Sequence, residues 1–169
     1  VAQGVEAGGH RGSFDTKDIT GSLIGLFALL PAVVDAVKIP VVATGGIADA
    51  RGIAAALLLG ASAVQIGTGL LRTPEAGIAS AWADAIGTTL PEDTVPTRAF
   101  SGRFGRSIRT RYTQAAEKGP IPAPYPIQRN LTRAMRASAK NIDTMQAWAG
   151  QSAKLSRAKP STELLLELW

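Results

Sequence analysis

The sequence of 169 residues contains no cysteine and only one histidine, His10. The absence of cysteine excludes disulfide bonds, thiolate zinc sites and cysteine nucleophiles. A single histidine cannot build a multi-histidine metal site, so we expect no metal centre. Aromatic residues are also scarce, at 5% of the sequence. What remains is an apolar-rich chain, 46% hydrophobic and 18% charged, which is typical of a folded domain with a sizeable core.

Positive charge is concentrated in one part of the chain. Residues 1–97 carry 5 basic and 9 acidic side chains, whereas residues 98–159 carry 13 basic and 2 acidic ones. A basic segment can indicate nucleic-acid binding. This one has few of the interleaved aromatic residues that stack on bases. We therefore expect no nucleic-acid partner, and interpret the segment as a solvated helical face or as a surface that meets an anionic ligand.

One stretch, residues 52–71, has no charged side chain over 20 residues, which is long enough to span a bilayer. Gly60, Gly67 and Gly69 interrupt it, and it contains Gln65. We interpret it as a buried helix followed by a buried strand, and we expect no membrane association.

Short β-branched runs alternate with helical segments in the first half of the sequence. We predict a strand end at residues 1–3, strands at 39–44 and 63–66, and helices at 22–37, 49–59 and 74–86. Pro31 should kink the first helix or start a second one. Asp49 is a typical N-cap, and Gly60 a typical C-terminal glycine. This order predicts a parallel sheet covered by helices, in an α/β fold.

The pattern changes after Thr88. We predict a short strand at residues 94–100, a basic helix at 107–118, a proline-rich connector at 119–126, and helices near 127–139 and 161–168.

Glycine turns follow two successive predicted strands: Gly45-Gly46 after Thr44, and Gly67-Thr68 after Gln65-Ile66. The carboxyl ends of parallel strands form the functional face of such proteins. Glycines there let backbone N–H groups approach a phosphate at the start of the next helix. The simpler interpretation is that the glycines only make tight turns. Because two such turns occur in succession, we favour a phosphate site.

His10 lies in the sequence Gly8-Gly9-His10-Arg11-Gly12, directly after the first strand end. A lone histidine is usually structural. Its position on the same strand-end face as the glycine turns favours a role as a general base, or as a donor to a substrate oxygen. Glu6 could pair with Arg11 or hold a loop N–H, and Arg11 could simply be exposed.

Several runs together resemble the nitronate monooxygenases, formerly called 2-nitropropane dioxygenases. The runs are residues 1–12, with Glu6-Ala7-Gly8-Gly9-His10-Arg11-Gly12, then 40–49 and 60–68, which hold the two glycine turns, and finally 97–103, 124–128 and 148–151. Each run alone would be shared more widely. Together they are specific to this family or to its flavin-dependent relatives.

The resemblance implies the C-terminal portion of an FMN-binding (β/α)₈ TIM barrel, strands 6–8, with a small and mostly helical extra domain. Residues 1–88 would belong to the barrel, 89–140 to a substrate-side domain, and 141–169 to a helical segment that packs back on the barrel. His10 matches the active-site histidine of the family. The residues implied to bind FMN are Gln3 and Gly8 beside the flavin, Gly45, Gly46, Gly67 and Thr68 at the phosphate, and Gln65 and Ile66 in the pocket wall.

The implied activity is the FMN-dependent oxidation of alkyl nitronates by O₂ to carbonyl compounds and nitrite. The alternatives are a flavin enoyl-ACP reductase or an NAD(P)H:quinone reductase of the same superfold, and an inert fragment or phosphate-binding module. We expect a cytoplasmic protein, since no targeting segment is recognisable, and a possible partner is a second copy in a homodimer. The sequence starts at Val1, and strands 1–5 have no counterpart in it, so we expect it to be part of a longer protein.

Overall fold

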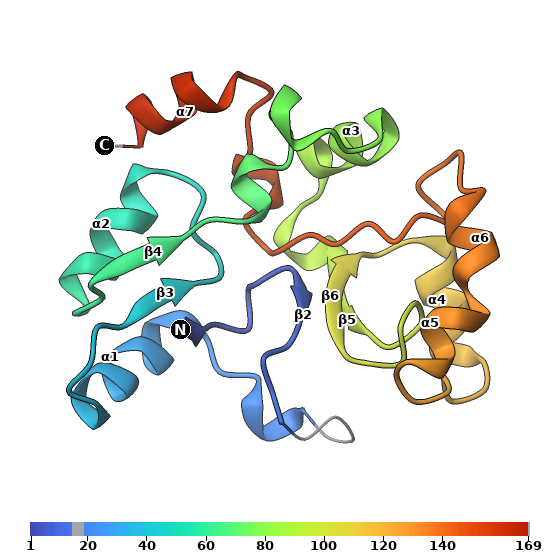
Figure 1. The fold of residues 1–169 in the computed structure, drawn as a ribbon, viewed down its shortest axis with the longest axis horizontal. Helices are drawn as coiled ribbons and strands as arrows, with labels where there is room; N and C mark the ends of the chain where they lie inside the picture. The colour runs from blue at the N-terminus through green and yellow to red at the C-terminus, as the bar shows by residue number, and fades with distance from the viewer. Residues whose placement is uncertain (15–18, 169) are drawn as a thin grey trace.

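The computed structural model describes residues 1–14 and 19–168, which form two three-stranded sheets with helices around them (Figure 1). The parallel sheet has the order β1-β3-β4, made of Ala2–Gln3, Val42–Thr44 and Ala63–Gln65. Ala2 pairs with Ala43, and Ala43 with Val64. The three predicted strands and their parallel arrangement are confirmed. β3 is shorter than residues 39–44, with Ile39 exposed and Pro40 lacking an N–H for the ladder.

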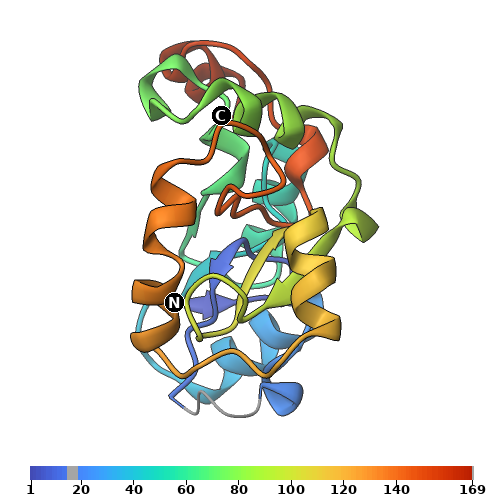
Figure 2. The same cartoon turned by 90° about the vertical axis from the view of Figure 1, so that its right-hand side faces the viewer.

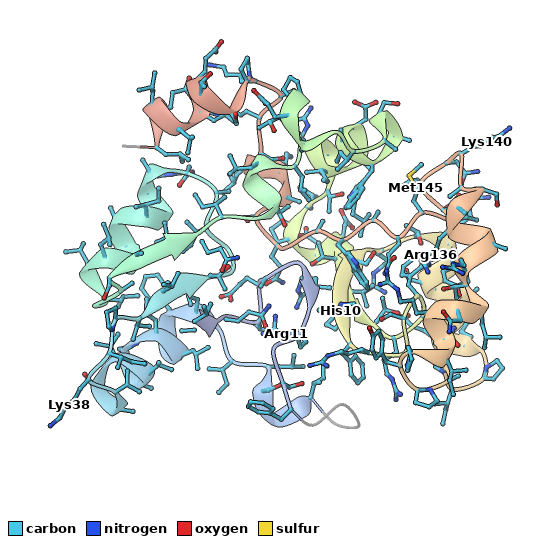
Figure 3. All side chains as sticks on the ribbon, in the orientation of Figure 1. His10, Arg11, Lys38, Arg136, Lys140 and Met145 are labelled. Carbon is cyan, nitrogen blue, oxygen red and sulfur yellow. The ribbon has the colours of Figure 1, made fainter. Side chains whose placement is uncertain are left out.

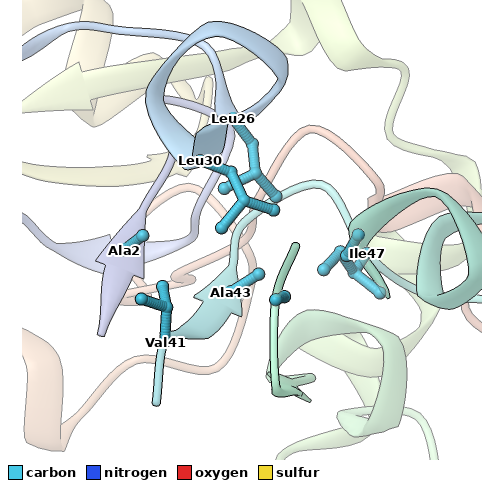
Figure 4. Packing of buried hydrophobic residues seen from close by; sticks show 8 residues of the cluster. Ala2, Leu26, Leu30, Val41, Ala43 and Ile47 are labelled. Carbon is cyan, nitrogen blue, oxygen red and sulfur yellow. The ribbon is translucent and has the colours of Figure 1, made fainter. Parts of the chain in front are cut away.

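Helix α1, Leu26–Ala36, covers the parallel sheet on one face. It runs through Pro31 without a break, starting later than the predicted residue 22 because Thr20–Ser22 forms a separate 3₁₀ turn. Leu26 and Leu30 pack on β1 and β3 in the main apolar cluster (Figure 4). The buried members of this cluster are Ala2, Leu26, Leu30, Val41, Ala43, Ile47, Ala56 and Ala61.

Helix α2, Ala50–Leu58, begins and ends as its sequence predicts. The Asp49 carboxylate accepts a hydrogen bond from the Gly52 N–H at 3.1 Å, and Gly60 follows the helix with a φ of +96°. The prediction that β4 is buried is wrong. Ala63 and Gln65 are exposed, because β4 is an edge strand of the sheet in the described part of the chain.

The predicted helix at 74–86 is also wrong as a single element. Pro74–Ala76 forms a 3₁₀ turn, and α3 starts only at Ser80 and runs Ser80–Thr88. Between them Gly77 has a φ of +61°, a left-handed conformation that ends the first turn.

The second sheet is antiparallel, with the order β2-β6-β5, made of Gly9–His10, Gly105–Ile108 and Thr94–Thr97. The predicted strand at 94–100 is thus confirmed over its first four residues. The predicted helix at 107–118 is wrong at its start, since β6 extends to Ile108 and α4 covers only Arg111–Lys118. The side chain of Thr110 caps this helix by accepting from the Thr113 N–H.

The remaining helices surround the antiparallel sheet and the C-terminal segment. Helices α4, α5 and α6 lie on the side of this sheet that faces away from the parallel sheet, with α4 (yellow) apart from α5 and α6 (orange) in Figure 2. Helix α5 comprises Ile127–Leu131, and α6 comprises Arg133–Ala137. A 3₁₀ turn at Ala153–Leu155 and helix α7, Ser161–Glu167, follow. The predicted helix at 127–139 is split at Thr132, whose hydroxyl donates to the Phe100 carbonyl at 2.6 Å.

A second apolar cluster joins α3 to β6 and the segment 147–153. Its buried members are Ile86, Ile108, Ala147, Ala149 and Ala153. The division into three parts at residues 88 and 140 stays a prediction. Among the described helices, none combines the length and the apolar character needed to cross a membrane.

Candidate active site

A cavity of about 680 Å³ opens at the carboxyl ends of the parallel strands. It is lined by β1 and the loop after it, the turn after β3 and the turn after β4, and also by residues 21–24, α1 and residues 150 and 152. The predicted site residues that it brings together are Gln3, Gly8, His10, Gly45, Gly46, Gln65, Gly67 and Thr68. Ile66 is the exception, because its side chain packs against the main apolar cluster instead.

The glycine turns bring backbone to the cavity surface. Gly45 and Gly46 have φ values of +110° and +71°, in the left-handed region that favours glycine. A Cβ on Gly45 would lie 3.1 Å from the Ala7 nitrogen, so the turn also packs closely on the loop after β1. A Cβ on Gly67 would meet nothing within 4 Å. At Gly67 the cavity therefore borders bare backbone.

The segment after β1 that carries His10, residues 4–12, is called the histidine loop below. Gln3, at the end of β1, holds this loop in place. Its Nε2 donates to the His10 carbonyl at 3.1 Å, and its Oε1 accepts from the Gly12 N–H at 2.8 Å. The amide still has one N–H and one oxygen lone pair for a ligand. Gln3 is thus both a cavity residue and a brace for the loop.

His10 lies on β2, an edge strand of the antiparallel sheet in the described part of the chain, and lines the cavity (Figure 3). Its Nε2 is 2.8 Å from the Ser101 Oγ, and its ring packs against Trp148 at a centroid distance of 5.1 Å. Burial lowers the pKa of His10 below its usual 6.5, and the positive charges of Arg103 and Arg129 lower it further. The imidazole is therefore neutral at pH 7, as a general base must be.

Arg11 is a buried cation on the same wall. Its side chain is 5% exposed, so it is not the exposed residue that the sequence allowed. Its Nη2 donates to the Gln3 carbonyl at 3.1 Å, whereas Nε and Nη1 have no hydrogen-bond partner among the described residues. Burial lowers the pKa of Arg11, and the negative charge of Glu6 opposes that shift. The guanidinium therefore places a positive charge just behind the cavity surface.

Glu6 takes the second of the two roles that the sequence left open. Its carboxylate accepts from the Leu26 N–H, at 3.0 Å to Oε1 and 3.2 Å to Oε2. This N–H belongs to the first residue of α1 and would otherwise lack an intrahelical acceptor. Glu6 therefore caps α1 and ties it to the histidine loop.

The histidine loop also packs closely against the C-terminal segment at Gly150 and Gln151. A Cβ on Gly8 would lie 2.6 Å from the Gly150 nitrogen. The Gly150 N–H donates to Thr68 Oγ1 at 2.9 Å, and the Gln151 N–H donates to the Glu6 carbonyl at 2.9 Å. The backbones at Gly8 and Gly150 are so close that only glycine fits at position 8, and Thr68 lies beside it.

Ser101 and Trp148 are the site residues that sequence reasoning missed. Both lie in runs that carry the family resemblance, yet nothing in their spacing ties them to His10. The pairing of β2 with β6 brings Ser101 to a histidine 91 positions away. Such a long-range strand pairing has no local sequence signal.

Comparison with known proteins identifies the family of this chain. The family model described as nitronate monooxygenase matches residues 1–169. The chain belongs to the nitronate monooxygenase family. A probable nitronate monooxygenase of Staphylococcus aureus (strain Newman) is 42% identical over 170 residues. The alignment covers 98% of this chain and 48% of that relative, so the chain spans about half the length of the curated relatives it matches.

Two solved structures also match this chain over nearly its whole length. A nitroalkane oxidase from Streptomyces ansochromogenes matches with a TM-score of 0.90 and 43% identity, over 98% of this chain and 49% of that one. FabK from Thermotoga maritima matches with a TM-score of 0.79 and 32% identity, over 98% and 51%. The chain has an α/β fold that matches these TIM-barrel-family structures over about half of their length, and its described residues form no closed barrel.

Proposed function

We propose that this chain is the half of an FMN-dependent nitronate monooxygenase that binds the cofactor phosphate and carries the catalytic histidine. On this proposal β1, β3 and β4 are strands 6, 7 and 8 of a barrel that a further segment completes. The single observation that carries it is the convergence of both glycine turns and His10 on one cavity.

The residues around the cavity fit FMN. Its volume of about 680 Å³ is in the usual range of cofactor sites, about 300–1,000 Å³. Gly45, Gly46, Gly67 and Thr68 would hold the phosphate through backbone N–H groups, and the bare backbone at Gly67 leaves room for it. Gln3 and Gly8 would lie against the flavin. When bound, FMN supplies the redox chemistry, accepting electrons from the substrate and passing them to O₂.

A nitronate is an anion, and the cavity wall offers it positive charge. Arg11 lines the cavity, and the positive charge of its buried guanidinium acts through space on a ligand there. Overall, two nitronate ions and one O₂ give two carbonyl compounds and two nitrite ions. The protein binds and orients the nitronate, so that its carbon lies beside the cofactor.

A neutral nitroalkane must first lose a proton from carbon, and neutral His10 is placed to take it. The carbon–hydrogen bond breaks, its electron pair moves onto the nitro group, and the imidazole becomes an imidazolium. A positioned general base contributes about 10²–10⁴-fold to such a step.

The test is His10→Asn in the full-length enzyme. We expect the variant to keep its FMN, because the phosphate is held by the glycine turns. We expect kcat/KM to fall by about 10²–10⁴-fold for neutral nitroalkanes and much less for preformed nitronates. Equal losses on the two substrate forms would contradict the base role, and no loss on either would place His10 outside the active site.

The likeness to FabK, at a TM-score of 0.79, favours a second candidate: a flavin reductase of the enoyl-ACP or quinone type that is reduced by NAD(P)H. Anaerobic mixing separates the two. Reduction of the flavin by a nitronate without NAD(P)H supports the oxidation of nitronates, whereas rapid reduction by NAD(P)H alone supports the reductase. A protein that stays colourless with added FMN would favour an inert fragment or a phosphate-binding module.

A further inference from the structure

The ring of His10 is held at one particular nitrogen. Nε2 lies 2.8 Å from the Ser101 Oγ, and Ser101 is 0% exposed. His10 pairs with Gly105 across the antiparallel sheet, and Ser101 lies in the turn that leads into that strand. The contact is therefore fixed by backbone pairing.

The hydrogen bonds of Ser101 decide which nitrogen carries the proton. A serine hydroxyl has one proton and two lone pairs. The Arg103 carbonyl, 3.1 Å from Oγ, can only accept, and the arrangement that satisfies it has the hydroxyl donating to it. The Arg103 N–H, 3.3 Å away, can only donate, and so it takes one lone pair. With the hydroxyl proton donated to Arg103, the second lone pair faces His10, and Nε2 is then the donor of the 2.8 Å contact.

We propose that Ser101 is a positioning residue that holds His10 in the Nε2–H tautomer and leaves the Nδ1 lone pair as the proton acceptor of the site. The role of Nδ1 as acceptor rests on the proposed function. The carbon–hydrogen bond of the substrate breaks, its proton goes to Nδ1 and its electron pair moves onto the nitro group, while the Nε2–H···Oγ bond is kept throughout.

Trp148 supplies a second constraint on the ring. It packs on His10 with an interplanar angle of 59°, and it contacts Phe100 edge-on at a centroid distance of 5.8 Å. Phe100 is itself fully buried next to Ser101. A ring flip that exchanged Nδ1 and Cδ2 would have to displace this aromatic contact as well as break the Ser101 bond.

The tautomer can be measured without any turnover. His10 is the only histidine in the sequence, so ¹⁵N labelling of histidine and long-range ¹H–¹⁵N NMR report on it, with His10→Asn assigning the signal. We expect a neutral ring at pH 8 with the proton on Nε2. A ring protonated on Nδ1, or a charged ring, would overturn the proposal even if the enzyme oxidises nitronates.

Ser101→Ala tests the positioning role. We expect loss of the single tautomer in the NMR spectrum, and a fall in kcat/KM of about 10- to 100-fold for neutral nitroalkanes, with little change for preformed nitronates. Ser156→Ala is the matched control, a buried serine whose Oγ donates only to the Ala153 carbonyl, and it should change neither. An unchanged tautomer in Ser101→Ala would overturn the role of Ser101. Absence of turnover by the unmodified enzyme would instead refute the proposed function.

Discussion

At the scale of single residues, the site combines a neutral base with buried cations. Burial lowers the pKa of His10, and likewise those of Arg11 and Arg106, two arginines close enough for their charges to repel. Glu6 is the acidic group whose charge opposes the shift at both arginines. Arg11 therefore brings positive charge to the cavity wall, with Glu6 as a partly compensating charge, while the pKa of His10 is lowered.

Arg129 offers a way to test this electrostatic setting. It is exposed, and its positive charge disfavours the imidazolium of His10. Arg129→Gln should therefore raise the pKa of His10 toward 6.5 and move the acid limb of activity on neutral nitroalkanes to higher pH. An NMR titration of His10 measures the shift directly.

Arg133→Gln is the matched control for that titration. Arg133 is an exposed arginine of the neighbouring helix, and its charge acts on Arg136 and not on His10. The pKa of His10 should therefore stay where it is. A pKa that did not respond to Arg129→Gln either would leave burial and Arg103 as the causes of the shift.

Residue-level prediction from the sequence succeeded where the signal was local. The glycine turns and His10 each follow a short β-branched run, so their shared face could be inferred from strand direction. The prediction that Ile66 lines the pocket is wrong. Side chains alternate in direction only within a strand, and Ile66 lies just after the end of β4. The contact of Ser101 with His10 depends on a strand pairing across the whole chain, which no local pattern encodes.

At the scale of elements, the glycine turns position the cavity and the helices that follow them. The Gly45-Gly46 turn has left-handed backbone at both residues, and α2 starts a few residues later. Helix α2 was predictable from Asp49 and Gly60, which act on their own neighbours. The break at Gly77 and the strand at 105–108 were not, because a left-handed glycine and a long-range ladder overrode the local helical preference.

Gly46→Val tests the phosphate turn in the full-length enzyme. Valine is strained at a φ of +71°, at a cost of about 1–3 kcal/mol, and its Cβ would lie 3.3 Å from the Glu6 Cβ. We expect FMN binding, measured by fluorescence titration, to be lost while helical content is largely kept. Normal flavin affinity in this variant would show that the phosphate lies elsewhere.

Gly77→Val separates strain from ligand contact. Gly77 has a similar φ of +61°, it lies outside the cavity, and a Cβ there meets nothing within 4 Å. We expect a similar loss in the free energy of unfolding with unchanged FMN affinity. The difference between the two variants is then the contribution of the turn to the cofactor.

At the scale of the whole molecule, the parallel sheet is open at both edges in the described part of the chain. β1 and β4 each have a partner on one side only, and the cavity lies against this open sheet. Exposed apolar residues such as Val1, Leu57 and Leu58 add to the surface near these elements. Free strand edges and exposed apolar side chains favour association with another segment.

We therefore expect the 169-residue chain alone to bind FMN on the order of 100-fold more weakly than a completed barrel, a difference of about 2.8 kcal/mol. The matched comparison is a chimera in which the first half of the Staphylococcus aureus relative precedes Val1. Titration of both proteins with FMN, and gel filtration for aggregation, measure the effect. Tight, stoichiometric binding by the chain alone would contradict the need for a second half.

Residues 1–14 enter both sheets, since β1 lies in the parallel sheet and β2 in the antiparallel one, with only residues 4–8 between them. The glycine turns are thus attached to one half of the molecule and the histidine to the other. Changes in residues 94–108 can then reshape what the histidine faces without altering the turns of β3 and β4. On the proposed function, substrate preference can then diversify, by natural divergence or by engineering, while the glycine turns keep their geometry.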